Sequence, residues 1–454
     1  MKRNEIEEQV LKKITPDQGY REKLHEIIEE IREKLEKEIK KRKLPVSIEL
    51  VGSTAKDTYI KDNLDIDFFL SFPSKFLRED IAKNALSIGK KLLENTEESY
   101  AEHPYIRGYY KNYEVEVVPC YKVENASQRL SAVDRTPLHT KFVKENILES
   151  QKPEVRLLKQ FLRGIGCYGA EAEIEGFSGY LCEILILKYG SFRKLLENSK
   201  EWKLGKKLAL TKGEHTVFNT PLTFIDPVDA NRNVASALSR EKFQLFVKAS
   251  DKYLKKPSIT FFFQNKIKPW TLEKINEEIQ KQKCLYIGVK IDKPNIISEN
   301  LYPQVRKAAR SIWEVSQRND FYIYDVKFYI DELENKIYFI IKTKKESLSE
   351  TLKHLGPPAK LKDNVDDFIN KWKDDPRVIK KPYEKNDRFY VEIKRDYIEM
   401  KDFLIDQVKS LSMGKHLGQI VRKKYIILEQ DDLLKDNLRA FWTEYLDKKM
   451  SWER

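Results

Sequence analysis

The sequence predicts an α+β protein with several domains. At 454 residues the chain exceeds the usual size of one hydrophobic core, and roughly two to four domains are expected. Segments with the helical spacing of apolar residues are interspersed with short alternating segments typical of strands. The pattern changes near residues 150 and 256, which predicts domains at residues 1–150, 151–256 and 257–454.

The first segment predicts a small mixed α/β domain. Residues 17–43 place apolar side chains on one stripe of a long helix, and residues 46–51 alternate like a half-buried strand. The remaining elements are expected at 64–70 (strand), 79–93 (helix), 105–110 (strand) and 113–118 (strand).

The other two segments differ from the first and from each other. Residues 151–256 are mainly helical, with helices expected at 154–163, 178–196 and 240–254. From residue 257 a strand, helix, strand, strand pattern predicts an RRM-like or ferredoxin-like unit with elements at 284–291, 304–317, 321–330 and 336–343. After it we expect a helical passage that includes 354–358 and 365–372, a strand at 389–393, and helices at 397–411 and 432–447.

Two acidic residues lie within the apolar second strand. Asp65 and Asp67 are two positions apart, so both face the same side while Ile66 and Phe68 face the other. The strand at 113–118 repeats this arrangement with Glu114 and Glu116. Adjacent carboxylates repel each other, and a hard divalent cation such as Mg²⁺ relieves that repulsion. We therefore predict a metal site, with Glu116 as the third ligand and Glu114 as its rival.

A glycine and a serine follow the first strand. Gly52-Ser53 allows a sharp turn, and a helix that begins there directs free backbone N–H groups outward, where they attract phosphate oxygens. Three carboxylates holding two Mg²⁺ ions beside a triphosphate are the arrangement that phosphoryl transfer requires. The simpler alternative is an ordinary helix start, with Ser53 as its N-cap and Lys56 as a surface lysine.

Composition limits the partners and the compartment. The net charge of +13 favours a polyanionic partner, although a lysine-rich solvated surface would give the same charge. No apolar run reaches membrane length, so no membrane association is expected. Four widely spaced cysteines without a CxxC pair are typical of reduced core thiols, which predicts a cytoplasmic protein.

The order of these motifs resembles the polymerase β nucleotidyltransferase superfamily, and within it the archaeal, class I CCA-adding enzymes (tRNA nucleotidyltransferases). The resemblance is specific over about the first half of the chain and looser after it. It is carried by Gly52-Ser53, Asp65-Ile66-Asp67 and the segments at 101–105, 117–121, 131–137, 154–159, 176–183, 226–229 and 232–235.

The resemblance implies both an architecture and an activity. Residues 1–150 would be the catalytic palm, residues 151–256 a helical nucleotide-binding domain, and residues 257–454 body and tail domains that cradle the acceptor end and T arm of tRNA. The implied reaction adds C, C and A to the tRNA 3′ end without a template. CTP and ATP are the implied substrates, pyrophosphate the leaving group and Mg²⁺ the cofactor.

The resemblance also assigns roles to individual residues. Asp65, Asp67 and Glu116 would bind the metal and catalyse transfer, although the family has an aspartate where this chain has Glu116. Gly52, Ser53 and Lys56 would contact the triphosphate. The remaining implied contacts are His139, Lys159 and Tyr168 (phosphates and sugar), Arg232 (base) and, as a candidate contact for the primer end, His103.

Other interpretations remain open at this stage. His139 is otherwise a loop histidine, Lys159 a solvated helix lysine, and Arg232 the partner of Asp229 in a salt bridge. A poly(A) polymerase, an oligoadenylate synthetase or a catalytically silent RNA-binding relative would share much of this pattern. The aromatic strand at 321–329 would stack RNA bases or pack in a core. The sequence leaves the oligomeric state open, with a homodimer as one candidate.

Overall fold

The computed structural model describes residues 4–61, 64–100, 102–211, 216–264, 267–344 and 347–454. The chain forms two compact units, Met1–Asn265 with Lys449–Arg454, and Lys266–Lys448. The first two predicted domains therefore lie within one unit, which the last residues of the chain rejoin. In the described part of the chain, no helix has the length and apolar character needed to cross a membrane.

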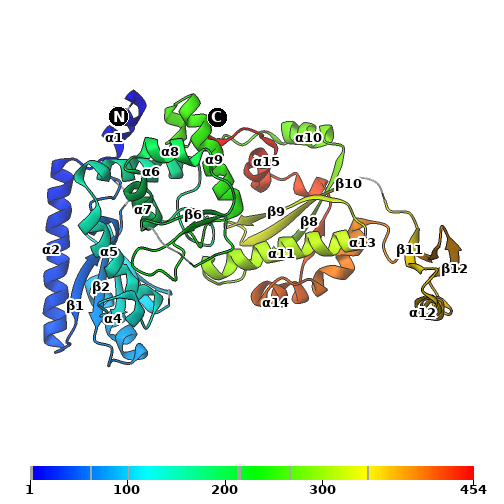
Figure 1. Cartoon of the computed structure of the whole chain (residues 1–454), viewed down its shortest axis with the longest axis horizontal. Coiled ribbons are helices and arrows are strands. Elements are labelled where there is room, and N and C mark those ends of the chain that lie inside the picture. Colours follow the sequence, from blue (N-terminus) through cyan, green and yellow to red (C-terminus); the bar gives the residue numbers. More distant parts are fainter. Residues whose placement is uncertain (1–3, 62–63, 101, 212–215, 265–266, 345–346) are drawn as a thin grey trace. The chain divides into compact units, whose positions relative to one another are not determined.

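A five-stranded sheet forms the centre of the palm (Figure 1). Its strands are β1 (Ser47–Val51), β2 (Ile66–Phe72), β3 (Glu94–Tyr100), β4 (Pro104–Tyr110) and β5 (Tyr113–Tyr121). They are ordered β1-β2-β5-β4-β3, with β2 parallel to β5 and the other neighbours antiparallel. The expected strands are confirmed, except that β2 begins at Ile66 and leaves Asp65 just before it, and β3 is an additional edge strand.

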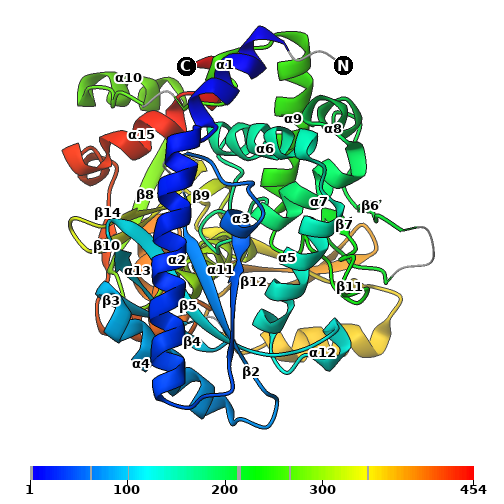
Figure 2. The same cartoon turned by 90° about the vertical axis from the view of Figure 1, so that its left-hand side faces the viewer.

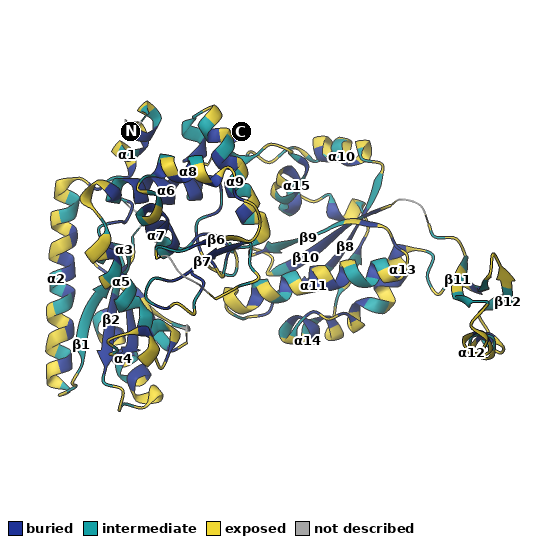
Figure 3. Ribbon diagram, in the orientation of Figure 1, coloured by how far each residue is buried: buried dark blue, intermediate teal, exposed yellow. Residues whose placement is uncertain are grey.

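Two helices cover one face of this sheet. Helix α2 (Gln18–Lys41) begins where the Asp17 carboxylate accepts a hydrogen bond from the Tyr20 N–H at 2.9 Å, and it lies along the strands in Figure 2. Its apolar stripe packs with α4 (Arg78–Leu92) against Ile66, Phe68 and Val117. The exposed outer side of α2 is visible in Figure 3. Because side chains alternate along a strand, Asp67 and Glu116 face the side away from these helices.

The rest of the first unit is largely helical. Its helices are α1 (Glu5–Ile14), α5 (Arg135–Asn146), α6 (Lys152–Gly164), α7 (Gly179–Tyr189), α8 (Phe192–Ser199) and α9 (Arg240–Lys255), with short strands β6 (Lys206–Leu208) and β7 (Leu222–Phe224). The prediction of one helix at 178–196 is wrong. Gly190 adopts φ 81° and ends α7, and the Ser191 hydroxyl accepts from the Lys194 N–H to begin α8.

The second unit contains a four-stranded antiparallel sheet. Its strands are β8 (Cys284–Asp292), β9 (Ile323–Asp331), β10 (Lys336–Lys344) and β14 (Ile426–Leu428), ordered β14-β8-β10-β9. Numbered within this sheet, the order is 4-1-3-2, and α11 (Ser298–Arg318) connects the first two strands. This order confirms the ferredoxin-like prediction. Further helices of the unit are α10 (Leu272–Lys281), α13 (Met400–Gln407), α14 (Lys415–Lys423) and α15 (Arg439–Leu446).

Between β10 and α13 the chain adds a second, three-stranded sheet. It consists of β11 (Thr351–Pro358), β12 (Val378–Lys385) and β13 (Arg388–Lys394), with α12 (Lys362–Trp372) against one face. The helical prediction at 354–358 is wrong, because the two prolines that end this segment favour extended backbone. The predicted helices at 397–411 and 432–447 are also too long, since α13 ends at Gln407 and α15 begins at Arg439.

Candidate active site

The palm sheet brings three side chains into one row on its open face. Asp67 on β2 lies opposite Glu116 on β5, and Glu116 lies opposite Arg107 on β4. Asp65 precedes β2, and its carbonyl accepts a hydrogen bond from the Thr54 hydroxyl at 2.7 Å. Thus three adjacent strands, two of them parallel, bring residues about fifty positions apart in sequence next to each other.

Gly52 lies directly beneath the Asp67 carboxylate. It begins the short helix α3 (Gly52–Ala55) with φ 72°, a conformation that residues with a side chain rarely adopt. A Cβ atom placed on Gly52 would lie 2.0 Å from Oδ2 of Asp67. The turn therefore requires glycine both for its backbone and for the space that the carboxylate occupies. Ser53 follows it, half-buried at the start of α3.

Burial and neighbouring charges raise the pKa values of Asp67 and Glu116. Burial raises the pKa of Asp67 to about 8, and the charges of Glu116 and Asp65 add to this effect. Burial also raises the pKa of Glu116, although the Arg107 guanidinium opposes the change. Oxygen donors that repel one another are suited to a hard divalent cation. The described residues, however, include no group of three side chains already close enough to coordinate one ion.

Lys56 and Lys159 meet around a buried carboxylate. The Lys56 ammonium donates to Glu183 Oε2 at 2.6 Å, and Lys159 Nζ lies 3.6 Å from Glu183 Oε1. Thr58 donates from its hydroxyl to Glu183 Oε1 at 2.6 Å. Burial alone would raise the pKa of Glu183, but the two ammonium groups hold it below its ordinary value. Helix α6 supplies Lys159 and α7 supplies Glu183, so this cluster connects the palm with the helices.

The Tyr168 hydroxyl and Lys159 Nζ both lie near the first residue of α7. A Cβ atom on Gly179, the first residue of α7, would lie 3.2 Å from the Tyr168 hydroxyl and 3.8 Å from Lys159 Nζ. The Arg163 guanidinium lies 4.7 Å from the centre of the Tyr168 ring. Two predicted nucleotide-binding residues, Lys159 and Tyr168, therefore converge at the start of one helix.

Asp226 connects the other two predicted nucleotide-binding residues. Its carboxylate contacts His139 Nε2 at 2.8 Å and accepts from Arg232 Nη1 at 2.9 Å and from the Tyr180 hydroxyl at 3.1 Å. The His139 and Tyr180 rings are stacked with centroids 4.0 Å apart. Burial lowers the pKa of His139 even though Asp226 opposes that shift.

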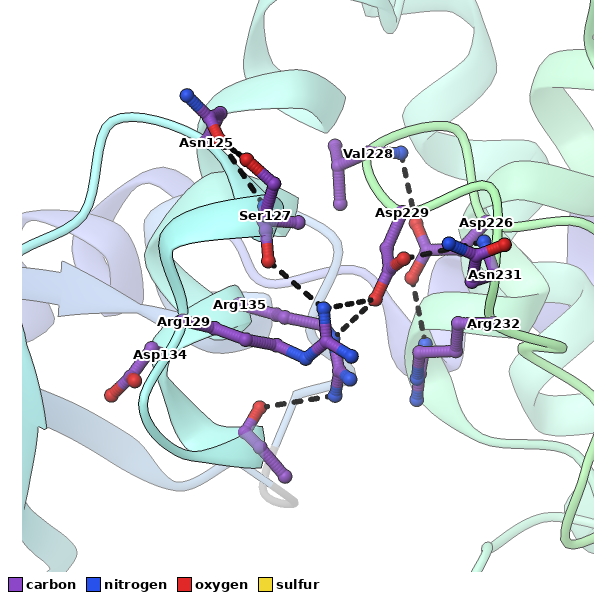
Figure 4. A network of polar contacts seen from close by, with 12 residues as sticks. Asn125, Ser127, Arg129, Asp134, Arg135, Asp226, Val228, Asp229, Asn231 and Arg232 are labelled. Atoms are coloured by element: carbon purple, nitrogen blue, oxygen red, sulfur yellow. Dashed lines mark hydrogen bonds and ion pairs between the residues drawn. The ribbon is translucent and has the colours of Figure 1, made fainter.

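The alternative salt bridge between Arg232 and Asp229 is wrong (Figure 4). Asp229 instead contacts Arg135 Nε at 2.9 Å and Arg129 Nη1 at 3.4 Å. These arginines belong to the segment after β5, whereas Asp226, Asp229 and Arg232 share one loop of the helical part. The loop is therefore attached to the palm through Asp229, and Arg232 is held separately by Asp226.

His103 lies away from these groups and is buried, with 1% of its surface exposed. Its Nδ1 accepts a hydrogen bond from Arg78 Nε at 3.2 Å, and its ring packs edge-on against Tyr121. Nε2 has no hydrogen-bond partner among the described residues. Contact between this ring and a primer end would require the surrounding loop to move.

Comparisons with known proteins match this chain over most of its length. Three family models match: "Nucleotidyltransferase domain" over residues 28–139, "tRNA nucleotidyltransferase, second domain" over 153–263, and "CCA-adding enzyme, C-terminal domain" over 283–430. The CCA-adding enzyme of Methanosarcina barkeri is 35% identical over 94% of this chain and 94% of its own length. The chain belongs to the CCA-adding enzyme family.

A second relative agrees with this assignment. The CCA-adding enzyme of Archaeoglobus fulgidus is 35% identical over 99% of this chain and 100% of its own length. A solved structure of the Cid1 poly(U) polymerase is 12% identical, and that match covers 57% of this chain and 97% of the other with a TM-score of 0.46. Members of the CCA-adding enzyme family are nucleotidyltransferases, whose chemistry depends on a divalent metal ion.

For a CCA-adding enzyme, the structure adds residues that the sequence did not indicate. Arg107, Glu183 and Asp226 each hold a predicted site residue by a direct contact. Glu183 and Asp226 lie within the matched segments 176–183 and 226–229, so their segments were found but not their roles. Arg107 could have been suspected only from the alternation of its strand, which places it on the same face as the acids of the neighbouring strand.

Proposed function

We propose that this chain adds C, C and A to the 3′ end of tRNA, without a nucleic-acid template, from CTP and ATP with release of pyrophosphate. Membership of the CCA-adding enzyme family over almost the whole chain carries this proposal. The row of Asp67 and Glu116 beside the Gly52-Ser53 turn supports it, because a nucleotidyltransferase needs carboxylates next to a phosphate-binding turn.

In this proposal Asp65, Asp67 and Glu116 hold Mg²⁺. The ion, when bound, would activate the primer hydroxyl and neutralise charge on the leaving pyrophosphate. The chain's own task is to place the Asp67 and Glu116 carboxylates side by side on one face, which strands β2 and β5 do through their parallel register. Gly52 leaves the space in which the Asp67 carboxylate lies.

We further propose that Ser53, Lys56, Lys159 and Tyr168 bind the triphosphate and sugar. Glu183 balances only one of the two ammonium charges in its cluster, so a positive charge remains for a phosphate group. The Lys56 and Lys159 side chains are only 6% and 3% exposed. They would therefore act on the phosphates mainly through their positive charge and through Thr58, with little direct contact.

Arg232 and His139 are proposed to bind the base and the adjacent phosphate. Asp226 holds both side chains, which fixes the direction of the Arg232 guanidinium. Arginine suits this task because its planar donors can meet several base acceptors at once. Selection between C and A would then depend on the position that Asp226 imposes on Arg232.

The second unit is proposed to contact the acceptor end and T arm of tRNA. Its three-stranded sheet has α12 on one face, whereas Lys353, Tyr383 and Tyr390 lie on the other. Lys353 Nζ lies 4.0 Å from the centre of the Tyr390 ring, and the Tyr383 and Tyr390 rings are stacked 6.1 Å apart. Aromatic rings with adjacent lysines bind nucleotide bases and phosphates together.

The proposed location is the cytoplasm, and the four free cysteines fit it.

One experiment separates this function from its rivals. The purified protein is incubated with Mg²⁺, all four nucleoside triphosphates and a tRNA that ends at the discriminator base. Addition of C, C and A followed by arrest is expected. A long A-tract or 2′–5′ products would contradict the proposal, and binding without incorporation would indicate a silent RNA-binding relative. Light scattering of the same sample tests the homodimer.

A further inference from the structure

The third carboxylate of the candidate metal site is already bound to a cation that the chain itself supplies. Arg107 on β4 donates to Glu116 Oε1 from Nε at 2.8 Å and from Nη2 at 2.5 Å. The same Nε lies 3.1 Å from Oε1 of Glu114. One guanidinium therefore contacts both acidic side chains on this face of β5.

The register of the sheet places Arg107 and Glu116 next to each other. Arg107 lies directly opposite Glu116, and Glu116 lies directly opposite Asp67 on the far side. Arg107 on β4 is thus separated from Asp67 on β2 by one strand, β5. Burial of the Glu116 side chain, which is 17% exposed, strengthens its attraction to Arg107.

Arg107 donates hydrogen bonds to only one of the two carboxylate oxygens of Glu116. Both hydrogen bonds end on Oε1, and Oε2 accepts none from the residues that the structure describes. The longer reach of glutamate matters here, because an aspartate at this position would end about one C–C bond, roughly 1.5 Å, short of the same place. Glu116 therefore has the length to reach Arg107 across the strand.

We propose that Arg107 is a positioning residue that occupies Glu116 until a divalent cation is bound, so that Arg107 and the metal compete for this carboxylate. The inference rests on the proposed function, since it concerns the same site. Competition follows from charge: a guanidinium beside Glu116 repels an incoming divalent ion and neutralises part of the negative charge that attracts it.

The test measures metal binding directly, without nucleotide or RNA. Binding of Mn²⁺ to the full chain is followed by electron paramagnetic resonance for the wild type, Arg107→Gln and Arg107→Lys. Arg107→Gln is expected to tighten Mn²⁺ binding by about tenfold, because the competing cation is gone. Arg107→Lys keeps the charge but loses the two-nitrogen contact, so an intermediate affinity is expected.

A second background shows whether the effect passes through Glu116. In Glu116→Asp the carboxylate no longer reaches Arg107, so adding Arg107→Gln is expected to change Mn²⁺ affinity by less than about threefold. Lys90→Gln is the matched control, because it removes one positive charge as Arg107→Gln does. Lys90 pairs with Glu98 on β3, the edge strand of the same sheet. This substitution is expected to leave Mn²⁺ binding unchanged.

The outcomes separate this inference from the proposed function. Equal or weaker Mn²⁺ binding in Arg107→Gln, with nucleotide incorporation by the wild type intact, overturns the competition alone. An equally large effect of Lys90→Gln overturns it as well, because the change in Mn²⁺ affinity would then reflect the total charge of the protein and not the contact between Arg107 and Glu116. A wild-type chain that neither binds Mn²⁺ nor incorporates nucleotide overturns the proposed function itself.

Discussion

Gly52 combines a left-handed backbone with a neighbouring carboxylate, that of Asp67, which leaves no room for a Cβ atom. We expect Gly52→Ala to lower the free energy of unfolding by about 1–2 kcal/mol for the left-handed backbone. It should lower nucleotide incorporation at least about 100-fold, because the new Cβ displaces Asp67 by about an ångström or more. Incorporation is measured with CCA-less tRNA, and folding by circular dichroism.

Gly205→Ala is the matched control for Gly52→Ala. Gly205 has a similar φ of 80°, but a Cβ atom there would meet nothing within 4 Å. It should lose similar stability and keep its activity. Equal loss of activity in both variants would mean that backbone strain, and not the Asp67 carboxylate, explains the Gly52 result.

Asp67 makes stability and metal binding depend on pH in opposite directions. Its pKa of about 8 lies above the 3.8 of an unperturbed aspartate, so folding favours the protonated form. This contribution to stability is complete below pH 3.8 and is lost as the pH rises through about 8. A metal needs the ionised form, so metal affinity should rise over the same range.

We therefore expect Mn²⁺ affinity to rise up to about tenfold per pH unit until pH 8, and the melting temperature in EDTA to fall. Asp67→Asn should flatten both trends. Calorimetry and Mn²⁺ titration from pH 6 to pH 9 measure them. Asp251→Asn, at an exposed carboxylate paired with Lys255, should leave both trends unchanged. Trends that persist in Asp67→Asn would show that another group titrates.

Glu183 is the counterion of two buried lysines. Glu183→Gln leaves Lys56 and Lys159 without a carboxylate, and we expect it to lower the free energy of unfolding by about 3–5 kcal/mol in urea. Adding Lys56→Met should restore part of this loss by removing one unpaired charge. If the double variant is less stable than Glu183→Gln, packing and not charge explains the loss.

The residues predicted from the sequence and those missed differ in a physical way. Asp65, Asp67 and Gly52 are local, because two acids on one strand and a glycine after a strand follow from spacing alone. Glu183 and Arg107 act through contacts with residues 127 and 9 positions away. Such pairs depend on strand register and helix packing, which a single sequence does not contain.

At the scale of elements, the helices and strands with a long periodic pattern of apolar residues were predicted correctly. Helix α2 and strands β2, β5 and β10 lie where the apolar repeat placed them, because one buried face specifies each. The break between α7 and α8 was missed because Leu195 and Leu196 continue the apolar run across Gly190. Strand β14 has only three residues and no resolvable period.

The exposed face of β11-β13-β12 yields a prediction about RNA. Tyr390→Ala should weaken tRNA binding by about tenfold through lost stacking. Lys353→Gln should lower the slope of log affinity against log salt by about one. Fluorescence anisotropy with labelled tRNA at several salt concentrations measures both effects. Lys362→Gln, on α12 at the opposite face, is the control and should change neither quantity. Unchanged tRNA binding in Tyr390→Ala and Lys353→Gln would place the RNA elsewhere.

At the scale of the whole molecule, the second unit is inserted into the first along the sequence. The chain leaves the first unit near residue 265 and rejoins it at Lys449–Arg454. The sequence predicted a change of pattern near this boundary, yet it could not show the return. Trp452, six positions after the end of α15, is a single apolar residue and forms no periodic pattern.

Trp452 provides the last test, because it is the main apolar contact of the returning segment. Its ring stacks on Phe261 at 5.0 Å, and its carbonyl accepts from the Thr260 hydroxyl at 2.9 Å. Trp452→Ala should lower the free energy of unfolding of the first unit by about 3 kcal/mol. Hydrogen exchange should then rise in peptides from α6 and α9 and stay unchanged in peptides from β8 and β10.

Trp442→Ala is the reciprocal control, since that ring is fully buried beside Tyr286 in the second unit. It should raise hydrogen exchange in β8 and β10 and leave α6 and α9 unchanged. Each unit has its own hydrophobic core, so a cavity in one core removes contacts only within that unit. If either substitution raises exchange equally in both units, the chain unfolds as one cooperative body and the returning segment couples the two cores.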